Sequence, residues 1–151
     1  NGYDTLFLAL IARKVYAFDV QELAIENTKE RLERNRIHNV QMVFDSHENV
    51  DQYVEENLKA ALFNLGHLPG SDKRVATSVP SKINAIKKIQ KKLVPGGMIA
   101  LVVYVGKYGS EEESNELLDF VQSLPYDEYH IIKYCYLNKE KAPYVIIMEK
   151  Q

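Results

Sequence analysis

Apolar and polar residues alternate along the chain in two kinds of segment, some with helical spacing and some as short apolar runs. The run at 98–105 is nearly unbroken, as is typical of a strand covered on both faces. The segment 4–12 has so few polar positions that we expect a mostly buried helix there. The pattern predicts helices over 4–12, 21–36, 49–58, 83–93 and 112–124, and strands over 14–20, 40–45, 59–66, 98–105, 129–137 and 143–149.

The repeated β-α-β order indicates the fold class. Such repeats form a mainly parallel sheet with right-handed crossovers and helices on both faces. The last two runs are joined by a short connection centred on 138–142, which predicts a C-terminal antiparallel β-hairpin. We therefore expect a Rossmann-like, doubly wound α/β fold. No linker, repeat or low-complexity tract interrupts it, so residues 1–151 are interpreted as a single domain.

The first residues suggest an incomplete sheet. "NGYDT" opens directly into a helix, whereas a doubly wound domain would have a central strand before it. "LALIA" also passes to "RKVYAF" with almost no loop. We expect that the N-terminal strand is missing from this sequence, together with a few residues near Ala12 and Arg13.

Composition narrows the class of protein. With 46% hydrophobic and 26% charged residues, the chain is typical of an α/β domain with a sizeable core. No apolar run approaches the roughly 20 residues that span a bilayer, so no membrane partner is expected. The single cysteine, Cys135, allows no internal disulfide, which favours a reducing cytoplasm. Because it lies in the apolar stretch 131–137, we expect a buried, inert thiol.

Charge is unevenly distributed along the chain. The net charge is −2, but residues 71–107 contain eight basic residues and one acid, which leaves 11 basic and 20 acidic residues elsewhere. Such separation can create a positive face that contacts nucleic acid. The alternative is that five of these lysines only solvate the outside of the predicted helix: Lys82, Lys87, Lys88, Lys91 and Lys92.

Candidate chemistry falls at the carboxyl ends of the predicted strands, where parallel sheets bind ligands. At the first helix, Asn1-Gly2 precedes Asp4-Thr5. A glycine there lets the backbone approach a ligand closely, and the helix terminus offers free N–H groups. Asp4 can equally be a helix cap.

The next strand ends in Asp19, with Gln21 just beyond. A carboxylate at this position can accept hydrogen bonds from the two hydroxyls of a ribose, and its separation from the first turn, roughly 17 residues, is close to the ~20 of dinucleotide-binding folds. The alternative is an N-cap for the helix at 21–36.

The following strand ends in "FDSHE". Asp45 or Ser46 can bind an adenine amino group or cap the next helix, and His47 can line a ring. The four histidines show neither HxxxH nor HExxH spacing, so no metal is expected.

The strand at 59–66 ends in "FNLGHLP". The amide of Asn64 offers a donor and an acceptor, and exposed backbone carbonyls can hold an amine. Methylation of an amine requires mainly positioning and desolvation of a neutral nitrogen lone pair. The chain shows no Ser-His-Asp order and no phosphate-binding GxxxxGK[ST] motif.

Five motifs together resemble a known family: "NGYDTLFLA", "VYAFDVQ", "DSHE", "AALFNLGHLPGSDK" and "LNKEKAPYVIIMEK". They are similar to class I S-adenosylmethionine-dependent methyltransferases of the rRNA methylase family, associated with methylation of the aminomethyl nitrogen of 5-aminomethyl-2-thiouridine at the tRNA wobble position. The resemblance spans essentially the whole chain. It implies S-adenosylmethionine as cofactor and the anticodon region of a tRNA as partner.

The resemblance also implies roles for individual residues. Asn64 and Gly66 would border the reacting centre as catalytic residues. The cofactor would contact Asn1, Gly2, Asp4, Thr5, Asp19, Gln21, Asp45, Ser46, His47, Asn64 and Leu65. The RNA would contact Leu68, Pro69, Asp72, Lys73, Thr77, Tyr104 and Gly106. Family members commonly carry histidine at the position of Lys107, so this chain departs from the pattern there.

Several functions stay open at this point. Methylation of rRNA or of a small-molecule amine uses the same chemistry. A nicotinamide-binding Rossmann module and a non-catalytic cofactor-binding scaffold use a similar sheet, although the terminal hairpin and the NLGxLP turn favour methyl transfer. A homodimer is compatible with the sequence, but no residue indicates one.

Overall fold

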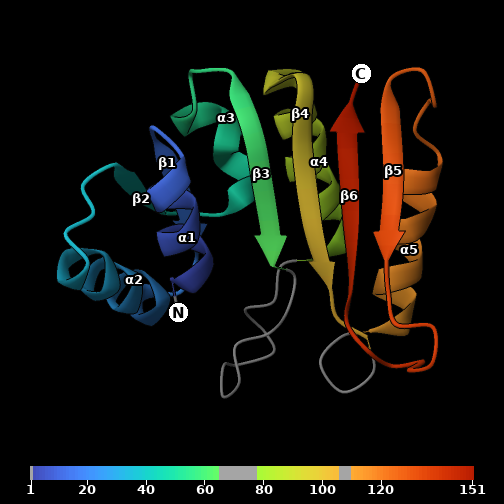
Figure 1. The fold of residues 1–151 in the computed structure, drawn as a ribbon, viewed down its shortest axis with the longest axis horizontal. Coiled ribbons are helices and arrows are strands. Elements are labelled where there is room, and N and C mark those ends of the chain that lie inside the picture. The colour runs from blue at the N-terminus through green and yellow to red at the C-terminus, as the bar shows by residue number, and fades with distance from the viewer. Residues whose placement is uncertain (1, 65–77, 106–109) are drawn as a thin grey trace. The chain divides into compact units, whose positions relative to one another are not determined.

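The computed structural model describes residues 2–64, 78–105 and 110–151. The chain divides into two compact units, residues 1–54 and 55–151, which are described separately below (Figure 1). The expectation of a single domain stays a prediction.

The first unit is a pair of parallel strands with helices. Its elements are α1 (Tyr3–Ile11), β1 (Val15–Asp19), α2 (Glu22–Arg34), β2 (Val40–Phe44), the 3₁₀ helix η1 (His47–Asn49) and α3 (Val50–Tyr53). β1 and β2 pair in parallel, with Val15 opposite Val40 and Asp19 opposite Phe44. The apolar face of α2 is buried as its spacing predicts, at Ala24, Ile25, Thr28 and Leu32.

Two expectations for this unit are wrong. α1 is not mostly buried, because Ala9 is its only buried residue; Phe7, Leu10 and Ile11 are 61%, 68% and 71% exposed. The helix expected over 49–58 ends at Tyr53. Val54 is extended and almost fully buried, and Leu58 already pairs with Leu93 in the other unit's sheet, so tertiary packing overrides the helical pattern.

The second unit is a four-stranded mixed sheet. It comprises β3 (Leu58–Asn64), α4 (Val79–Lys92), β4 (Leu93–Val103), α5 (Glu111–Gln122), β5 (Tyr129–Tyr134) and β6 (Tyr144–Lys150). The strand order is β3-β4-β6-β5, with β3 and β4 parallel and β6 antiparallel to both neighbours. The expected β5–β6 hairpin is confirmed, and β6 inserts between β4 and β5. α4 and α5 lie side by side on one face of this sheet (Figure 1).

The core of the second unit lies between the sheet and these two helices. Ile99 and Leu101 of β4 and Ile86 of α4 are all fully buried. On the opposite face of β4, Met98 is 48% exposed. The apolar run of β4 is therefore fully buried on one face and only partly buried on the other.

β4 begins earlier than the apolar run predicts. It starts at Leu93 and includes the Pro95-Gly96-Gly97 segment, which the sequence marks as a break. The register with β3 shifts here, because Leu58 pairs with Leu93 but Ala60 pairs with Met98. The β4 residues between Leu93 and Met98 therefore form a bulge. Gly97 is needed there because a Cβ would lie 2.7 Å from the Val94 carbonyl oxygen.

The last strand also holds the end of α4 in place. Lys150 Nζ donates hydrogen bonds to the carbonyl oxygens of Gln90 and Leu93, each at 2.9 Å. A cation at the carbonyl end of a helix interacts favourably with the helix dipole.

Cys135 follows β5 and is exposed, so the expectation of a buried thiol is wrong. The apolar residues around it do not enter the core: Tyr134, Tyr136 and Leu137 are all exposed as well. Separately, no helix in the described part of the chain is long and apolar enough to cross a membrane.

Candidate functional site

The carboxyl edge of β1 and β2 gathers the polar residues predicted for the cofactor. Asp19 is the last residue of β1 and lies opposite Phe44, so Asp45 and Ser46 follow β2 at the same edge. Asp19 Oδ1 accepts a hydrogen bond from the Gln21 backbone N–H at 3.0 Å. Gln21, not Asp19, is the N-cap of α2, so the capping alternative for Asp19 is not realised.

Asn39 determines which end of α1 faces this edge. Its Nδ2 donates to the carbonyl oxygens of Ala9 and Ala12, at 2.9 and 2.8 Å. Because Asn39 directly precedes β2, the end of α1 lies at the amino edge of the strands, and Gly2, Asp4 and Thr5 lie toward the carboxyl edge. The sequence carried no local signal for Asn39, since its partners are 27 and 30 residues away.

Gly2 is the N-cap of α1 and has a left-handed backbone, with φ of 70°. A Cβ there would lie 2.9 Å from both Cγ2 and Oγ1 of Thr28. The glycine is thus required by close packing against α2, a reason that the sequence did not indicate. The first-turn N–H groups of α1 remain suited to an anionic group.

Asp45 is held by three hydrogen bonds. Its Oδ2 accepts from the Tyr53 hydroxyl at 2.7 Å, and its Oδ1 accepts from Asn49 Nδ2 at 3.0 Å and from the Ser46 N–H at 2.7 Å. These bonds, that from Tyr53 foremost, lower the pKa of Asp45 against a smaller opposing effect of burial. In turn, the bond to Asp45 raises the pKa of Tyr53.

Ser46 Oγ accepts a hydrogen bond from the Glu48 N–H at 3.2 Å and so caps η1, which His47 opens. Ser46 therefore carries out the capping alternative, whereas Asp45 bonds the N–H of this N-cap residue and does not itself cap the helix. Their adenosine contacts, and that of His47, stay predictions.

Sequence reasoning missed Asn49 and Tyr53 as partners of Asp45. The three residues recur at a spacing of four, which places side chains on one side of a helical turn, so a signal was present. Tyr53 also packs edge-on against Phe18, with ring centroids 5.7 Å apart. This contact ties η1 and α3 to β1 one residue before Asp19.

The second unit has its own carboxyl edge. Asn64 ends β3 opposite Val102, and Tyr104 directly follows β4, so the structure brings Asn64 and Tyr104 to one edge. Asn64 is exposed and Tyr104 half-buried. The other predicted site residues lie outside the described residues: Asn1, Leu65, Gly66, Leu68, Pro69, Asp72, Lys73, Thr77 and Gly106.

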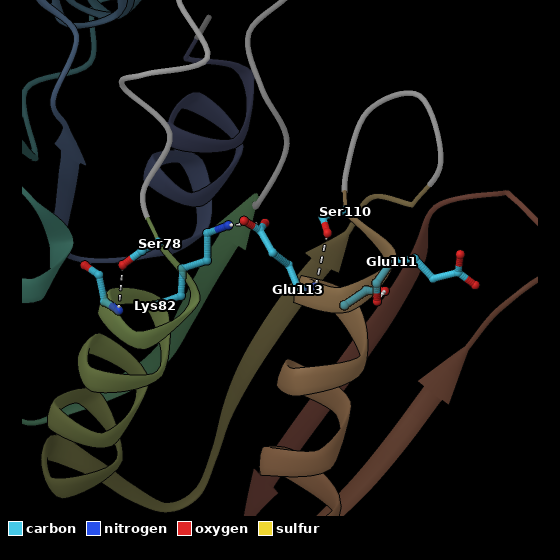
Figure 2. A network of polar contacts seen from close by, with 7 residues as sticks. Ser78, Lys82, Ser110, Glu111 and Glu113 are labelled. Atoms are coloured by element: carbon cyan, nitrogen blue, oxygen red, sulfur yellow. Dashed lines mark hydrogen bonds and ion pairs between the residues drawn. The ribbon is translucent and has the colours of Figure 1, made fainter.

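The lysines of α4 do not all solvate its outer face. Lys87 and Lys91 are exposed, but Lys82 is buried and its Nζ lies 3.7 Å from Glu113 Oε2 of α5 (Figure 2). The solvation alternative is therefore wrong for Lys82. The described residues also contain no cluster of three or more side chains that could ligate a metal ion.

The chain matches a protein family and a curated relative along most or all of its length. Residues 15–150 match the family model described as "Putative rRNA methylase". Over 165 residues the chain is 33% identical to a chloroplastic protein of Arabidopsis thaliana named tRNA (mnm(5)s(2)U34)-methyltransferase. The match includes the whole chain and spans 60% of the length of that curated relative.

Two solved structures are similar over nearly the whole chain. SMU.1697c of Streptococcus mutans, described as a putative methyltransferase in complex with SAH, is 41% identical with a TM-score of 0.92; the match covers 99% of this chain and 83% of that one. An rRNA-methylase, likewise described as putative, from Clostridium thermocellum is 33% identical with a TM-score of 0.93, over the same shares. The chain therefore belongs to the rRNA methylase family and has the class I methyltransferase fold.

Proposed function

We propose that this protein is an S-adenosylmethionine-dependent RNA methyltransferase, and that it methylates the aminomethyl nitrogen of the wobble uridine in the anticodon region of a tRNA. The observation that carries the proposal is the Streptococcus mutans relative, 41% identical and solved with SAH. The name of the Arabidopsis relative supports the tRNA acceptor. A cytoplasmic location is part of the proposal.

The residues of the first unit fit the cofactor. A carboxylate has about four lone-pair sites, so Asp19 can hold the Gln21 N–H and still accept hydrogen bonds from a ribose diol. The N–H groups at the start of α1 suit the carboxylate of the methionine moiety. We assign the adenosine contacts to the segment after β2, where Ser46 and His47 lie beside the Asp45 network.

S-adenosylmethionine supplies, when bound, an electrophilic methyl group on a sulfonium. Transfer of this methyl group to the amine would break the sulfur–carbon bond, form a nitrogen–carbon bond and release a proton from the amine to solvent. A neutral amine needs little help from a base, so alignment carries most of the catalysis. We assign this alignment to Asn64, whose amide oxygen can accept a hydrogen bond from the amine, and to the backbone at Gly66. Tyr104 is assigned to the RNA.

Cofactor identity is tested by calorimetry of the full-length protein with S-adenosylmethionine and with NAD. We expect binding of S-adenosylmethionine alone. Binding of NAD alone would overturn the cofactor assignment and favour the nicotinamide alternative.

The acceptor is tested by incubating the protein with S-adenosylmethionine and tRNA that lacks the terminal methyl group, followed by mass spectrometry of the nucleosides. We expect a gain of one methyl group at the wobble uridine. Methylation of rRNA or of a free amine in its place would contradict the tRNA assignment.

The role of Asn64 is tested in the same assay. Asn64→Ala is expected to lower kcat about 10–100-fold, because the amine would no longer be aligned. Asn138→Ala, in the exposed connection between β5 and β6, is the matched control. Equal rates for Asn64→Ala and the wild type would remove Asn64 from the mechanism.

A further inference from the structure

The carboxylate of Asp45, at the carboxyl edge of the first unit, is fixed on both of its oxygens. Oδ1 accepts from the Ser46 N–H at 2.7 Å and from Asn49 Nδ2 at 3.0 Å, and Oδ2 accepts from the Tyr53 hydroxyl at 2.7 Å. Asn49 and Tyr53 lie four and eight residues further along the chain. Donors from three different positions therefore determine how this carboxylate is oriented.

These bonds leave a defined acceptor site open on Asp45. A carboxylate has about four lone-pair sites, two on each oxygen. Of the hydrogen bonds that the described residues donate to this carboxylate, two fall on Oδ1 and one falls on Oδ2. Oδ1 is thus fully used. The open site lies on Oδ2, beside the Tyr53 hydroxyl, and the direction of that hydroxyl sets the direction of the open site.

The same bonds keep Asp45 an acceptor. They lower its pKa, with Tyr53 as the main cause, against a smaller opposing effect of burial. An ionised carboxylate can only accept hydrogen bonds, whereas a protonated one can also donate. The open site on Oδ2 therefore matches an N–H group of a ligand and repels a carbonyl oxygen.

Tyr53 is itself held in place. Its ring packs edge-on against Phe18, with centroids 5.7 Å apart and an angle of 79° between the ring planes. Phe18 directly precedes Asp19, which is assigned to the ribose. Val50 and Val54, on either side of Tyr53 along the chain, are both buried. The hydroxyl of Tyr53 is therefore carried by a turn that is anchored in the core and by a ring that is anchored on β1.

We propose that Tyr53 is a positioning residue for the cofactor: its hydroxyl directs the open acceptor site of Asp45 at the amino group of the adenine ring, so that the site selects adenine over hypoxanthine. This inference rests on the proposed function, in which the adenosine of S-adenosylmethionine is assigned to the segment after β2. Hypoxanthine has a carbonyl oxygen in place of the amino group, so two acceptors would face each other.

Two ligands that differ in the base alone test this selection. SAH contains adenine, and S-inosylhomocysteine contains hypoxanthine. Calorimetry of the full-length protein gives the Kd of each. We expect the wild type to bind SAH at least about tenfold more tightly, because a site built to accept a hydrogen bond rejects a ligand that cannot donate it.

Tyr53→Phe keeps the ring on Phe18 and removes only the hydroxyl. We expect the Kd for SAH to rise about tenfold and the Kd for S-inosylhomocysteine to change by less than about twofold. The variant also loses stability, since Asp45 loses a hydrogen bond. The ratio of the two Kd values is therefore the decisive measurement, because a general loosening of the site would weaken both ligands alike.

Two further variants complete the experiment. Tyr126→Phe removes the hydroxyl of a tyrosine that is 81% exposed, and it should change neither Kd by more than about twofold. Asp45→Asn replaces the acid by an amide, which offers a donor as well as an acceptor. It should bring the two Kd values within about threefold of each other.

Each outcome has a distinct meaning. If the wild type binds neither SAH nor S-adenosylmethionine, the proposed function fails and this inference fails with it. If the wild type prefers SAH and Tyr53→Phe keeps the same ratio of Kd values, Tyr53 is only structural and the inference alone is overturned. Equal affinities of the wild type for SAH and S-inosylhomocysteine would also overturn it, because Asp45 would then not select the amino group.

Discussion

Among single residues, Gly2 and Gly96 share a left-handed backbone, but only Gly2 is also tightly packed against another side chain. Gly2 and Gly96 both have a left-handed backbone, with φ of 70° and 76°. A Cβ at Gly2 would lie 2.9 Å from the Thr28 side chain, whereas a Cβ at Gly96 would meet nothing within 4 Å. The two positions therefore separate conformational strain from steric overlap.

Gly96→Ala is expected to lower the free energy of unfolding by about 1–2 kcal/mol, from the left-handed backbone alone. Gly2→Ala should lower it by about 2–4 kcal/mol, because overpacking against Thr28 adds to the same strain. Urea unfolding of both variants measures the difference. Equal losses would mean that α1 moves away from α2 at no cost.

Asp45 and Tyr53 give a prediction for pH dependence. The pKa of Asp45 lies below its ordinary value of 3.8 because the folded state hydrogen-bonds the carboxylate, with Tyr53 as the main cause. A carboxylate with a lowered pKa adds stability at pH values above 3.8, and that stability is lost as the pH falls through the folded-state value.

Tyr53→Phe should therefore be less stable than the wild type at neutral pH, and the gap should narrow once the pH falls below about 4. Urea unfolding at a series of pH values measures the gap. Tyr126→Phe, which removes the hydroxyl of an exposed tyrosine, is the control. A gap that stays constant down to pH 3 would show that the Tyr53 hydroxyl does not act through Asp45.

At the scale of elements, α4 and β4 depend on a residue from the far end of the chain. Lys150 of β6 donates to the carbonyl oxygens of Gln90 and Leu93, where the helix ends and the strand begins without a loop. The bulge at Gly96 and Gly97 follows at once. Lys150 thus serves as a cap that the local sequence of α4 lacks.

Lys150→Met is expected to lower the free energy of unfolding by about 1–3 kcal/mol, since two charge-assisted hydrogen bonds are lost while the aliphatic packing remains. Lys139→Met, in the exposed connection between β5 and β6, should change it by less than about 0.5 kcal/mol. Chemical denaturation compares the two. If both variants changed the free energy of unfolding by a similarly small amount, Lys150 would not be needed to stabilise the α4–β4 junction.

At the scale of the whole molecule, cofactor and RNA are expected to depend on different parts of the chain. The basic excess lies within residues 71–107, and the remainder is strongly acidic. Pairing of Lys82 with Glu113 removes one lysine from the surface available to RNA. The cofactor residues of the first unit lie outside this basic segment.

Asp19→Ala should weaken binding of S-adenosylmethionine and leave the salt dependence of tRNA binding unchanged. Lys73→Ala should weaken tRNA binding and reduce the slope of log K against log salt by about one, as loss of one phosphate contact does. Calorimetry for the cofactor and binding titrations at several salt concentrations measure both. An equal loss of cofactor affinity in the two variants would contradict this division.

The order of most elements and the terminal hairpin could be predicted from the sequence, as could the carboxyl edge of the first unit for Asp19 and Asp45 and that of the second unit for Asn64. These follow from short-range periodicity and from the rule that parallel strands end at one edge. Its motifs also carried the resemblance to the family that the comparisons confirmed.

The remaining features could not be predicted, because they depend on residues far apart in the chain. Thr28 explains Gly2, Asn39 orients α1 and Lys150 caps α4. The helix expected to include Val54 and the burial expected for Cys135 were wrong for the same reason. The burial of a residue depends on its packing partners and not on its neighbours in the sequence. The first turns of α4 and α5 show this most clearly. Lys82 and Glu113 are 31 positions apart in the sequence, and only the packing of α4 against α5 brings Lys82 Nζ within 3.7 Å of Glu113 Oε2.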